Sequence, residues 1–349
     1  MISLESRQTP ATEARPSLLD ARDRPLRDIR ISLTDHCNLR CTYCMPKEKF
    51  GPDHKFLPAD DWLTFEEIAI LVKNLAALGV RKVKLTGGEP LTRPFVASLI
   101  RLLHEAASQV EVNLITNGIL LAHEAARLKD AGLDRVTVSL DSLDPERFAV
   151  ISGRGSQLDK VLAGIDAAGY AGFRPLKINM VVIRGVNDDE VEAMAARFRH
   201  PDTVVRFIEY MDVGTLNGWR RTDVVPAAEI LARLRLGAAL APVDAAYRGE
   251  TAKRYRYTDG SGEVGFIASV SQPFCGDCSR LRLSADGKLF TCLFSKQGFD
   301  IKNILRGSGG TQRVRDALID LWQGRRDQYS VERANAPARE KVEMFYIGG

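Results

Sequence analysis

Strand-like and helical segments alternate along most of this chain, and that alternation limits the possible folds more than any other feature. Six runs rich in Val, Ile, Leu and Thr are predicted strands, at residues 29–34, 83–86, 110–116, 135–140, 176–182 and 204–210. Helical patterns lie between them, and the clearest starts with a capping box at Thr64 and Glu67 and ends at Gly79. Repeated βα units of this kind form a parallel sheet, either open or curved into a barrel.

Polar side chains occupy alternate positions in four of these strands. They are Arg30, Ser32 and Thr34; Lys82, Lys84 and Thr86; Thr137, Ser139 and Asp141; and Lys177 and Asn179. Parallel strands covered on both faces are normally apolar throughout, and one face in water suits an edge strand but not four strands. We therefore expect a polar lumen. Because buried cations need negative charge nearby, its ligand should be polyanionic, with phosphates as the obvious candidates.

Unusual residues gather where the predicted strands end. Cysteines follow the first strand, Gly87-Gly88-Glu89-Pro90 the second, Asn117-Gly118 the third, Asp141 the fourth and Met211-Asp212 the sixth. Barrels of βα units carry their active sites at this carboxyl edge. Together with the polar lumen, this favours an α/β fold with an incomplete (βα)6 barrel of the TIM type.

Three cysteines, Cys37, Cys41 and Cys44, form a CxxxCxxC array directly after the first strand. Four-iron clusters are normally held by four cysteines, so three thiolates leave one iron open to an outside molecule. A zinc site takes four protein ligands, or three plus water, and usually draws its cysteines from CxxC pairs. Buried bystander cysteines are not expected this close together on a polar loop. The array therefore favours an iron–sulfur cluster.

A second group of cysteines lies beyond the alternating region. A helix is predicted at 226–236 and strands at 253–258 and 264–270, followed by Cys275, Cys278 and, after a hairpin turn at Asp286-Gly287, Cys292. In isolation, zinc and an iron–sulfur cluster are equally good interpretations of this group. The presence of the first array favours a second four-iron cluster with one open iron.

The rest of the C-terminal part offers two further candidates. Arg280 and Arg282 share one face of a predicted strand, which suits either phosphate oxygens or a solvated surface. A helix is predicted at 311–325. The chain then ends in an apolar segment closing on Gly348-Gly349, which is either a frayed terminus or a tail that enters a narrow site.

Composition and length restrict the class of protein. The 349 residues suffice for a large barrel or two domains, and no apolar run is long enough to cross a membrane. Residues 1–25 lack the apolar core of a secretory signal and are predicted to be a flexible arm. With no such signal, six cysteines in two groups indicate a reducing cytoplasm and metal binding. The net charge of +4 fits a polyanionic small substrate or nucleic acid and decides neither.

The cysteine spacing, with Tyr43 before the last cysteine, resembles that of the radical S-adenosylmethionine (SAM) superfamily. Other stretches resemble one of its families, the GTP 3′,8-cyclases of molybdenum cofactor biosynthesis. They are residues 30–46, 86–93, 117–118, 138–141, 177–179, 206–214, 274–294 and the terminal Gly348-Gly349. The resemblance runs from about Asp28 to the end and leaves only the predicted arm at 1–25 outside it. It implies a radical SAM partial TIM barrel at 26–236 and a C-terminal α+β extension at 237–349. The extension would close the barrel mouth and carry the second cluster.

The resemblance also implies a reaction. An adenosyl radical made from SAM removes hydrogen from ribose C3′ of GTP, and the carbon radical attacks guanine C8. The product is (8S)-3′,8-cyclo-7,8-dihydroguanosine 5′-triphosphate. The implied cofactors are two [4Fe–4S] clusters and SAM. The implied partners are an electron donor of the flavodoxin or ferredoxin type and a downstream cyclic pyranopterin monophosphate synthase, with neither membrane nor nucleic acid. We expect a monomer or homodimer, in the cytoplasm that the cysteines indicate.

Site roles carried over from the family fall into four groups. The first cluster would be held by Cys37, Cys41 and Cys44 and the second by Cys275, Cys278 and Cys292. SAM would contact Tyr43, Gly88, Ser139 and Met211, and GTP would contact Arg30, Lys84, Ile115, Lys177, Arg206, Arg280 and Arg282. Gly348 and Gly349 would have a catalytic role. Two positions depart from the family pattern. Lys84 stands where arginine is usual and Ile115 where threonine is usual, so we expect altered nucleotide affinity and an unchanged reaction.

Two other functions are weighed against this one. A radical SAM enzyme that modifies a peptide or another metabolite would not need a lumen rich in Lys and Arg. A zinc-stabilised nucleic-acid-binding protein would carry its basic residues on an exposed face beside aromatic residues, whereas here they follow strand parity and aromatics make up only 7%.

Overall fold

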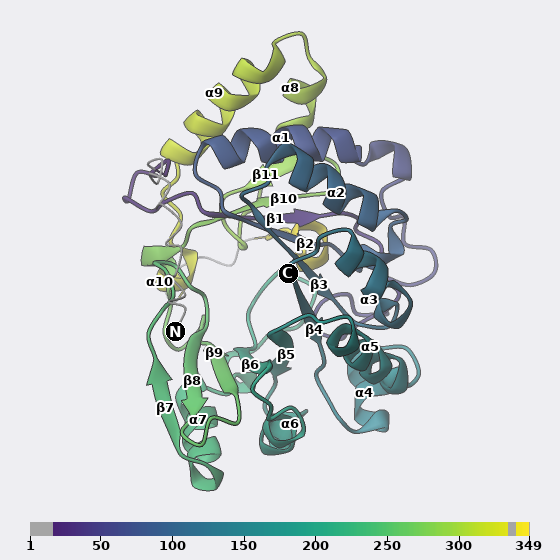
Figure 1. The fold of residues 1–349 in the computed structure, drawn as a ribbon, viewed down its shortest axis with the longest axis vertical. Coiled ribbons are helices and arrows are strands. Elements are labelled where there is room, and N and C mark those ends of the chain that lie inside the picture. The colour runs from purple at the N-terminus through teal and green to yellow at the C-terminus, as the bar shows by residue number, and fades with distance from the viewer. Residues whose placement is uncertain (1–16, 334–339, 349) are drawn as a thin grey trace, which may run out of the picture.

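The computed structural model describes residues 17–333 and 340–348. Six neighbouring strands, β1 to β6, run parallel and in chain order through the middle of the sheet (Figure 1). They are β1 (Asp28–Ser32), β2 (Lys82–Thr86), β3 (Glu111–Thr116), β4 (Arg135–Ser139), β5 (Leu176–Val182) and β6 (Thr203–Glu209). The predicted incomplete (βα)6 barrel is confirmed, and each predicted strand end lies within two residues of the observed one.

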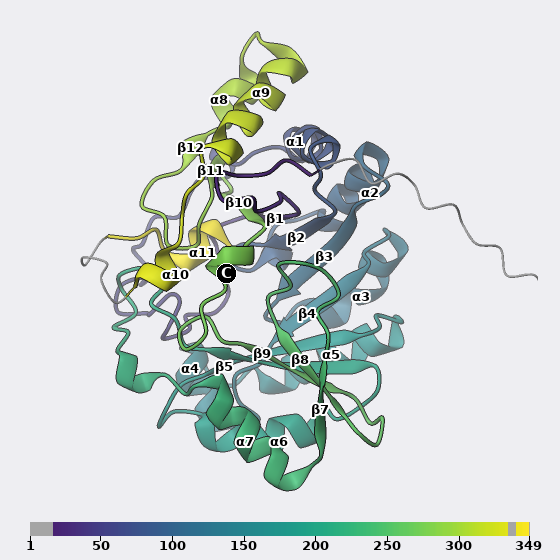
Figure 2. The ribbon, with the colours of Figure 1, turned by 90° about the vertical axis from the view of Figure 1, so that its left-hand side faces the viewer.

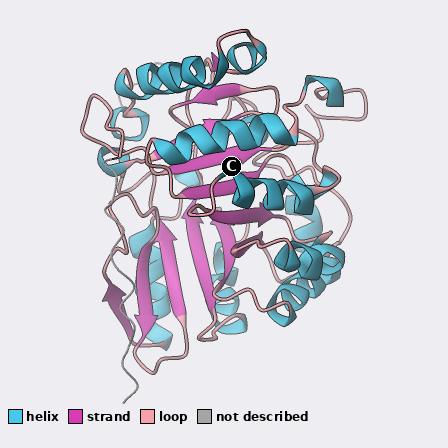
Figure 3. Cartoon of the chain, turned by 45° about the horizontal axis from the view of Figure 1, so that its top comes forward, coloured by secondary structure: helices cyan, strands magenta, loops and turns pink. Residues whose placement is uncertain are grey.

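Helices cover the outer face of this sheet (Figures 1 and 3). They are α1 (Phe65–Ala77), α2 (Val96–Ala106), α3 (Leu121–Asp130), α4 (Pro145–Ser152), α5 (Leu158–Tyr170), α6 (Val191–Arg197) and α7 (Ala227–Gly237). The predicted capping box starts α1, because Thr64 Oγ accepts from Glu67 N at 3.1 Å and Glu67 Oε2 accepts from Thr64 N at 2.8 Å. The apolar side chains at alternate strand positions, for example Ile29 and Val83, are fully buried beneath these helices. The polar side chains at the intervening positions therefore face the inner side of the sheet.

The C-terminal third extends the same sheet at both ends. Beside β6 lie β9 (Glu263–Ile267), β8 (Lys253–Tyr257) and β7 (Leu240–Val243), and beside β1 lie β10 (Arg280–Leu283), β11 (Lys288–Phe290) and β12 (Phe299–Asp300). Strand β9 is parallel to β6 and β10 is parallel to β1, and the predicted hairpin at Asp286-Gly287 joins β10 to β11. The segment between β9 and β10 therefore crosses from one edge of the curved sheet to the other.

The remaining helices lie at several points along the chain. They are the α-helices α8 (Lys302–Arg306), α9 (Gly310–Gln323), α10 (Tyr329–Glu332) and α11 (Met344–Ile347), and the 3-10 helices η1 (Ala59–Asp61), η2 (Pro90–Thr92), η3 (Asp188–Glu190), η4 (Arg221–Asp223) and η5 (Cys275–Asp277). Figure 2 shows α10 and α11 between the β10–β12 end of the sheet and the β7–β9 end. Among the described helices, none is both long and apolar enough to span a bilayer.

The end of the predicted N-terminal arm belongs to the folded body. Leu19 pairs with Pro25 in an isolated β-bridge, and Asp20 and Arg24 are buried. The backbone amide of Leu18 donates to Leu78 O at 3.0 Å. Residues 17–25 are thus packed, whereas 1–16 lie outside the described residues.

Candidate active site

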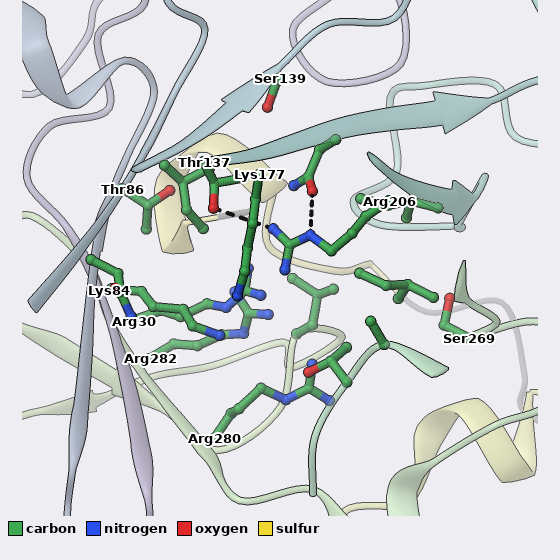
Figure 4. Close-up of a pocket in the computed structure, with 18 of the residues that line it drawn as sticks. Arg30, Lys84, Thr86, Thr137, Ser139, Lys177, Arg206, Ser269, Arg280 and Arg282 are labelled. Atoms are coloured by element: carbon green, nitrogen blue, oxygen red, sulfur yellow. Dashed lines mark hydrogen bonds between the residues drawn. The ribbon is translucent and has the colours of Figure 1, made fainter. Parts of the chain in front are cut away.

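The inner face of the curved sheet lines a cavity of about 750 Å³. Six of its lining residues are the predicted cationic contacts Arg30, Lys84, Lys177, Arg206, Arg280 and Arg282. Strand register brings them together, because Arg30 lies beside both Lys84 of β2 and Arg282 of β10. Figure 4 shows these side chains converging, with Lys177 and Arg206 reaching in from β5 and β6. The polar, basic lumen expected from strand parity is therefore present.

Burial and mutual repulsion make this cavity a strong site for an anion. Burial, together with Arg206, Arg135 and Lys82, lowers the pKa of Lys177 to about 7. Burial and the neighbouring cations also lower the pKa of Arg30 to about 10 and that of Lys84 well below its ordinary value. Each of these groups becomes easier to charge when negative charge enters the cavity. The site therefore favours a ligand with several negative charges.

Two acidic residues, Asp28 and Glu111, lie at the amino ends of the strands beside these cations. Burial lowers the pKa of Arg30 and of Lys84, and the buried Asp28 carboxylate opposes both shifts. Glu111 lies 2.9 Å from Arg135 and 3.8 Å from Lys82, toward the amino ends of the strands. Arg206 instead donates to neutral groups, Asn179 Oδ1 at 2.8 Å and Thr137 Oγ at 3.3 Å (Figure 4). Its guanidinium is held in place without being neutralised, which leaves its charge for a ligand.

The two residues that depart from the family pattern also line the cavity. Lys84 keeps a basic group on the lumen face, but an ammonium cannot make the two parallel hydrogen bonds of a guanidinium. Ile115 lies on β3 directly beside Thr137 of β4, and its side chain offers no hydrogen bond.

The first cysteine group stands at the carboxyl end of β1, where the sequence predicts it. Cys37, Cys41 and Cys44 all line the cavity, and Cys44 N donates to Cys41 O at 3.0 Å. Leu39 N donates to Cys37 Sγ at 3.4 Å. Burial raises the pKa of the Cys37 thiol to about 11, and burial with the neighbouring thiolates raises that of Cys41 well above its ordinary value. Three adjacent thiolates are costly here unless bound iron supplies positive charge, which fits a cluster.

Residues predicted to contact SAM surround this group. Tyr43, Gly88, Ser139 and Met211 line the same cavity, and Tyr43 OH donates to Asp141 Oδ2 at 2.7 Å. A Cβ atom at Gly88 would lie 2.2 Å from His36 O, so only glycine allows this approach of the two loops.

Glu89 has a positioning role in this region. Its carboxylate accepts from Thr116 Oγ at 2.7 Å, Asn117 N at 2.7 Å and Leu91 N at 3.0 Å. Burial raises the pKa of this carboxyl to about 7, although those hydrogen bonds oppose the shift. Glu89 therefore caps the turn after β2 and fixes the end of β3. Asn117 in turn donates to Asn38 Oδ1 at 2.7 Å beside the first cysteine group.

The second cysteine group lies on the other side of the cavity. Cys275 begins η5, Cys278 directly follows it and Cys292 follows β11, and all three line the cavity. Burial favours the neutral Cys278 thiol, but the positive charges of Arg280 and Arg325 lower its pKa to about 6. Arg280 Nη2 also donates to Cys278 Sγ at 3.3 Å. A thiolate with cations around it is a ready ligand for a metal cluster.

The metal-binding assignments rest on these cysteines and their surroundings. Within residues 17–333 and 340–348, no three His, Cys, Asp or Glu side chains are arranged to hold a single metal ion. The two cysteine groups lie at opposite ends of neighbouring parallel strands, because the first follows β1 and Cys275 and Cys278 precede β10. The six cations line the same cavity (Figure 4).

The C-terminal tail enters the site. Gly348 O accepts a hydrogen bond from Arg282 Nη1, and Phe345 is buried against Phe50 with ring centroids 4.9 Å apart. Gly348 has φ +74°, and an added Cβ would lie 2.3 Å from Thr86 Cγ2. The tail is therefore packed as far as Gly348, against two residues that line the cavity, and its part in the reaction stays a prediction. Gly349 lies outside the described residues.

Several residues that line the cavity gave no signal in the sequence, and Ser269 is one of them. The Ser269 hydroxyl is 3% exposed, lines the cavity, and has no hydrogen-bond partner among the described residues. It follows β9, beyond the six alternating strands, so strand parity gave no signal for it. The buried carboxylate of Glu209 fixes this turn by accepting from Val270 N and Ser271 N, both at 2.8 Å.

Comparisons with known proteins agree with this architecture. The profile of the Radical SAM superfamily matches residues 31–198, and that of Molybdenum Cofactor Synthesis C matches residues 203–331. A protein of Acidothermus cellulolyticus named GTP 3′,8-cyclase is 49% identical over 357 residues, covering 95% of this chain and 98% of that protein. A protein of the same name from Xanthomonas campestris is 50% identical, covering 95% of this chain and 97% of that protein. Another from Staphylococcus haemolyticus is 44% identical, covering 95% of this chain and 98% of that protein.

Two solved structures share the fold at low sequence identity. Streptococcus suis SuiB bound to the precursor peptide SuiA has a TM-score of 0.54 and 15% identity, covering 84% of this chain and 68% of that one. Native anSMEcpe with bound AdoMet has a TM-score of 0.52 and 17% identity, covering 84% and 83%. These two similarities support the fold alone.

Proposed function

Because the chain belongs to the GTP 3′,8-cyclase family of the radical SAM superfamily, we propose that it converts GTP to (8S)-3′,8-cyclo-7,8-dihydroguanosine 5′-triphosphate. This is the first step of molybdenum cofactor biosynthesis. The observation that carries the proposal is one cavity with a cysteine triad on either side and six cationic side chains on its wall. A triphosphate is the ligand that such a wall would neutralise.

A [4Fe–4S] cluster and SAM follow from membership of the radical SAM superfamily. Cys37, Cys41 and Cys44 would hold that cluster, which supplies the electron that converts SAM to the hydrogen-abstracting adenosyl radical. Tyr43, Gly88, Ser139 and Met211 would bind SAM on the same side of the cavity. The hydrogen bond from Tyr43 to Asp141, which holds the ring beside the first cysteine group, supports this assignment. We assign residues 26–236 to this barrel and 237–349 to the extension that completes both sheet edges.

Cys275, Cys278 and Cys292 would hold a second [4Fe–4S] cluster. Its donor set includes a thiolate favoured by Arg280 and Arg325, and its open iron would face the guanine base. The triphosphate would then lie along Arg30, Lys84, Lys177, Arg206, Arg280 and Arg282, with Ile115 in apolar contact. Gly348 and Gly349 would close the site over the nucleotide, which excludes water from the radical reaction.

The partners follow from the same reaction. A flavodoxin or ferredoxin would supply the electron, and a cyclic pyranopterin monophosphate synthase would take the product. The functional unit would be a monomer or homodimer in the cytoplasm, with no nucleic acid or membrane partner.

The test is 5′-deoxyadenosine formation by the anaerobically reconstituted protein with reductant and SAM. GTP should raise deoxyadenosine formation strongly and be consumed, ATP should not, and Cys37→Ser should abolish both effects. If SAM is cleaved slowly and GTP does not change the rate, the protein is still a radical SAM enzyme but GTP is not its substrate. A peptide-modifying reaction would then be the better proposal.

A further inference from the structure

We propose that Asp20, Arg24 and Arg325 are positioning residues for the second cysteine site, where they hold the Cys275–Cys278 turn through its backbone carbonyls and place positive charge beside its thiolates. This inference rests on the proposed function, because it requires the second [4Fe–4S] cluster. It assigns a role to residues 20–24, which the sequence alone indicated to be part of a flexible arm.

The network connects both cysteines of the turn to one carboxylate. Arg24 Nη1 donates to Cys275 O at 2.9 Å, and Arg325 Nη1 donates to Cys278 O at 2.6 Å. The two guanidiniums meet at Asp20 Oδ2, which lies 2.6 Å from Arg24 Nε and 3.3 Å from Arg325 Nη1. The backbone positions of both cysteines are therefore fixed by groups outside the turn.

All three side chains are removed from water. Relative exposure is 5% for Asp20, 0% for Arg24 and 4% for Arg325. Buried charges are retained only where they are paired and hydrogen-bonded, and breaking such a group is strongly destabilising. The network is also braced from α9, because Trp322 Nε1 donates to Arg24 O at 3.2 Å and Arg325 lies 4.6 Å from the Trp322 ring.

The network carries more positive than negative charge, and the excess lies beside the cysteines. Two guanidiniums share the Asp20 carboxylate, and the partly exposed Asp327 carboxylate lies 3.6 Å from Arg325 Nε. Among the residues that the structure describes, Arg24 Nη2 is buried with no hydrogen-bond partner. Thiolates of the neighbouring cysteine site would supply the missing negative charge. Groups around metal ligands act in this way on affinity and on ligand geometry.

A purely structural role is the alternative explanation. In that case the network only ties the N-terminal segment to α9, and its loss would weaken the whole protein and both cluster sites equally. A positioning role instead predicts a selective effect on the second site. Iron retention at each site, measured separately, distinguishes the two.

The experiment uses two backgrounds of the full-length chain. In the first, Cys37, Cys41 and Cys44 are replaced by alanine, so that only the second site binds iron after anaerobic reconstitution. In the other, Cys275, Cys278 and Cys292 are replaced by alanine. Arg325→Lys, which keeps the charge, and Arg24→Gln are introduced into each background. Arg22→Gln is the matched control, because Arg22 is exposed in the same segment and donates to Arg326 O at 3.1 Å.

The readouts are iron and sulfide content, cluster absorbance, and the rate of iron loss to a chelator, together with the melting temperature of the apoprotein. In the first background, Arg325→Lys and Arg24→Gln should lose iron about 10-fold faster than the parent, as expected for groups that support metal ligands. Arg22→Gln should match the parent. In the other background, all three substitutions should leave iron retention unchanged.

Equal iron retention by parent, Arg24→Gln and Arg325→Lys in the first background would overturn the inference while leaving the second cluster in place. Equal acceleration in both backgrounds would also overturn it, because the network would then be only structural. If the parent of the first background binds no iron at all, the proposed second cluster fails and the inference fails with it.

Discussion

Lys177 provides the sharpest test of how the cavity binds its ligand. Its pKa of about 7 results from burial first and from Arg206, Arg135 and Lys82 next. A bound triphosphate reverses the second cause, because its negative charges favour the ammonium form. We therefore predict that nucleotide binding at alkaline pH takes up a proton at Lys177.

The magnitude follows from the pKa. At pH 8 a group with a pKa of about 7 is about one tenth protonated, so full protonation in the complex takes up about 0.9 proton. A ligand that binds with proton uptake binds more weakly as pH rises. The dissociation constant should thus increase up to about tenfold per pH unit above pH 7, until the pKa of the complex is reached. Lys84, whose pKa is also lowered by burial, should contribute in the same direction.

The assay is anaerobic titration calorimetry of GTP at pH 8 in buffers with different ionisation enthalpies, which gives the protons taken up. Lys177→Gln should reduce uptake by about 0.9 proton and flatten the pH dependence of binding. At pH 7 it should also weaken binding by about 10- to 100-fold, the effect of losing one charged hydrogen bond. Lys160→Gln, at an exposed position, is the control. Proton uptake that is the same in Lys177→Gln as in the parent would refute the reasoning.

Three further predictions concern the tail, the substrate pocket and the barrel helices. Gly348→Ala should reduce the amount of cyclised product at least about tenfold, because the added Cβ would collide with Thr86 Cγ2 and the backbone φ is +74°. The double variant with Thr86→Ser lacks that methyl group and should recover part of the activity. A double variant with no recovery would contradict this cause. Ile115→Thr should lower the KM for GTP about threefold or more by adding one hydrogen bond in the cavity, and an unchanged or higher KM would show that Ile115 does not face the nucleotide. Thr64→Ala should lower the free energy of unfolding by about 1 kcal/mol, measured by denaturant titration of the apoprotein, because Glu67 N loses its cap; a loss below about 0.3 kcal/mol would contradict that role.

Much of the fold could be predicted because local rules and tertiary packing agree in the barrel. The capping box at Thr64 starts α1 where expected, and the alternation of Arg30 with Ile29 and Ile31 puts the guanidinium in the lumen and the apolar side chains under the helices. The period-two pattern carried this information directly. Each strand face could therefore be assigned before the strand order was known.

Contacts between distant segments could not be predicted in the same way. Nothing local in 280–283 indicates that β10 pairs in parallel with β1, although this pairing places Arg282 beside Arg30. The burial of Asp20 and Arg24 was missed for the same reason, because their partner Arg325 is about 300 residues away in the sequence. A polar segment that contains arginines is predicted to be a solvated arm unless its distant partner is known.

Transfer of the C3′ hydrogen tests the central claim most directly. GTP carrying deuterium at ribose C3′ is incubated with the anaerobically reconstituted protein, SAM and reductant, and the 5′-deoxyadenosine is analysed by mass spectrometry. The proposed reaction predicts that deuterium appears in 5′-deoxyadenosine together with loss of GTP. Deoxyadenosine that forms with GTP present but carries no deuterium would contradict abstraction at C3′, and with it the proposed cyclisation.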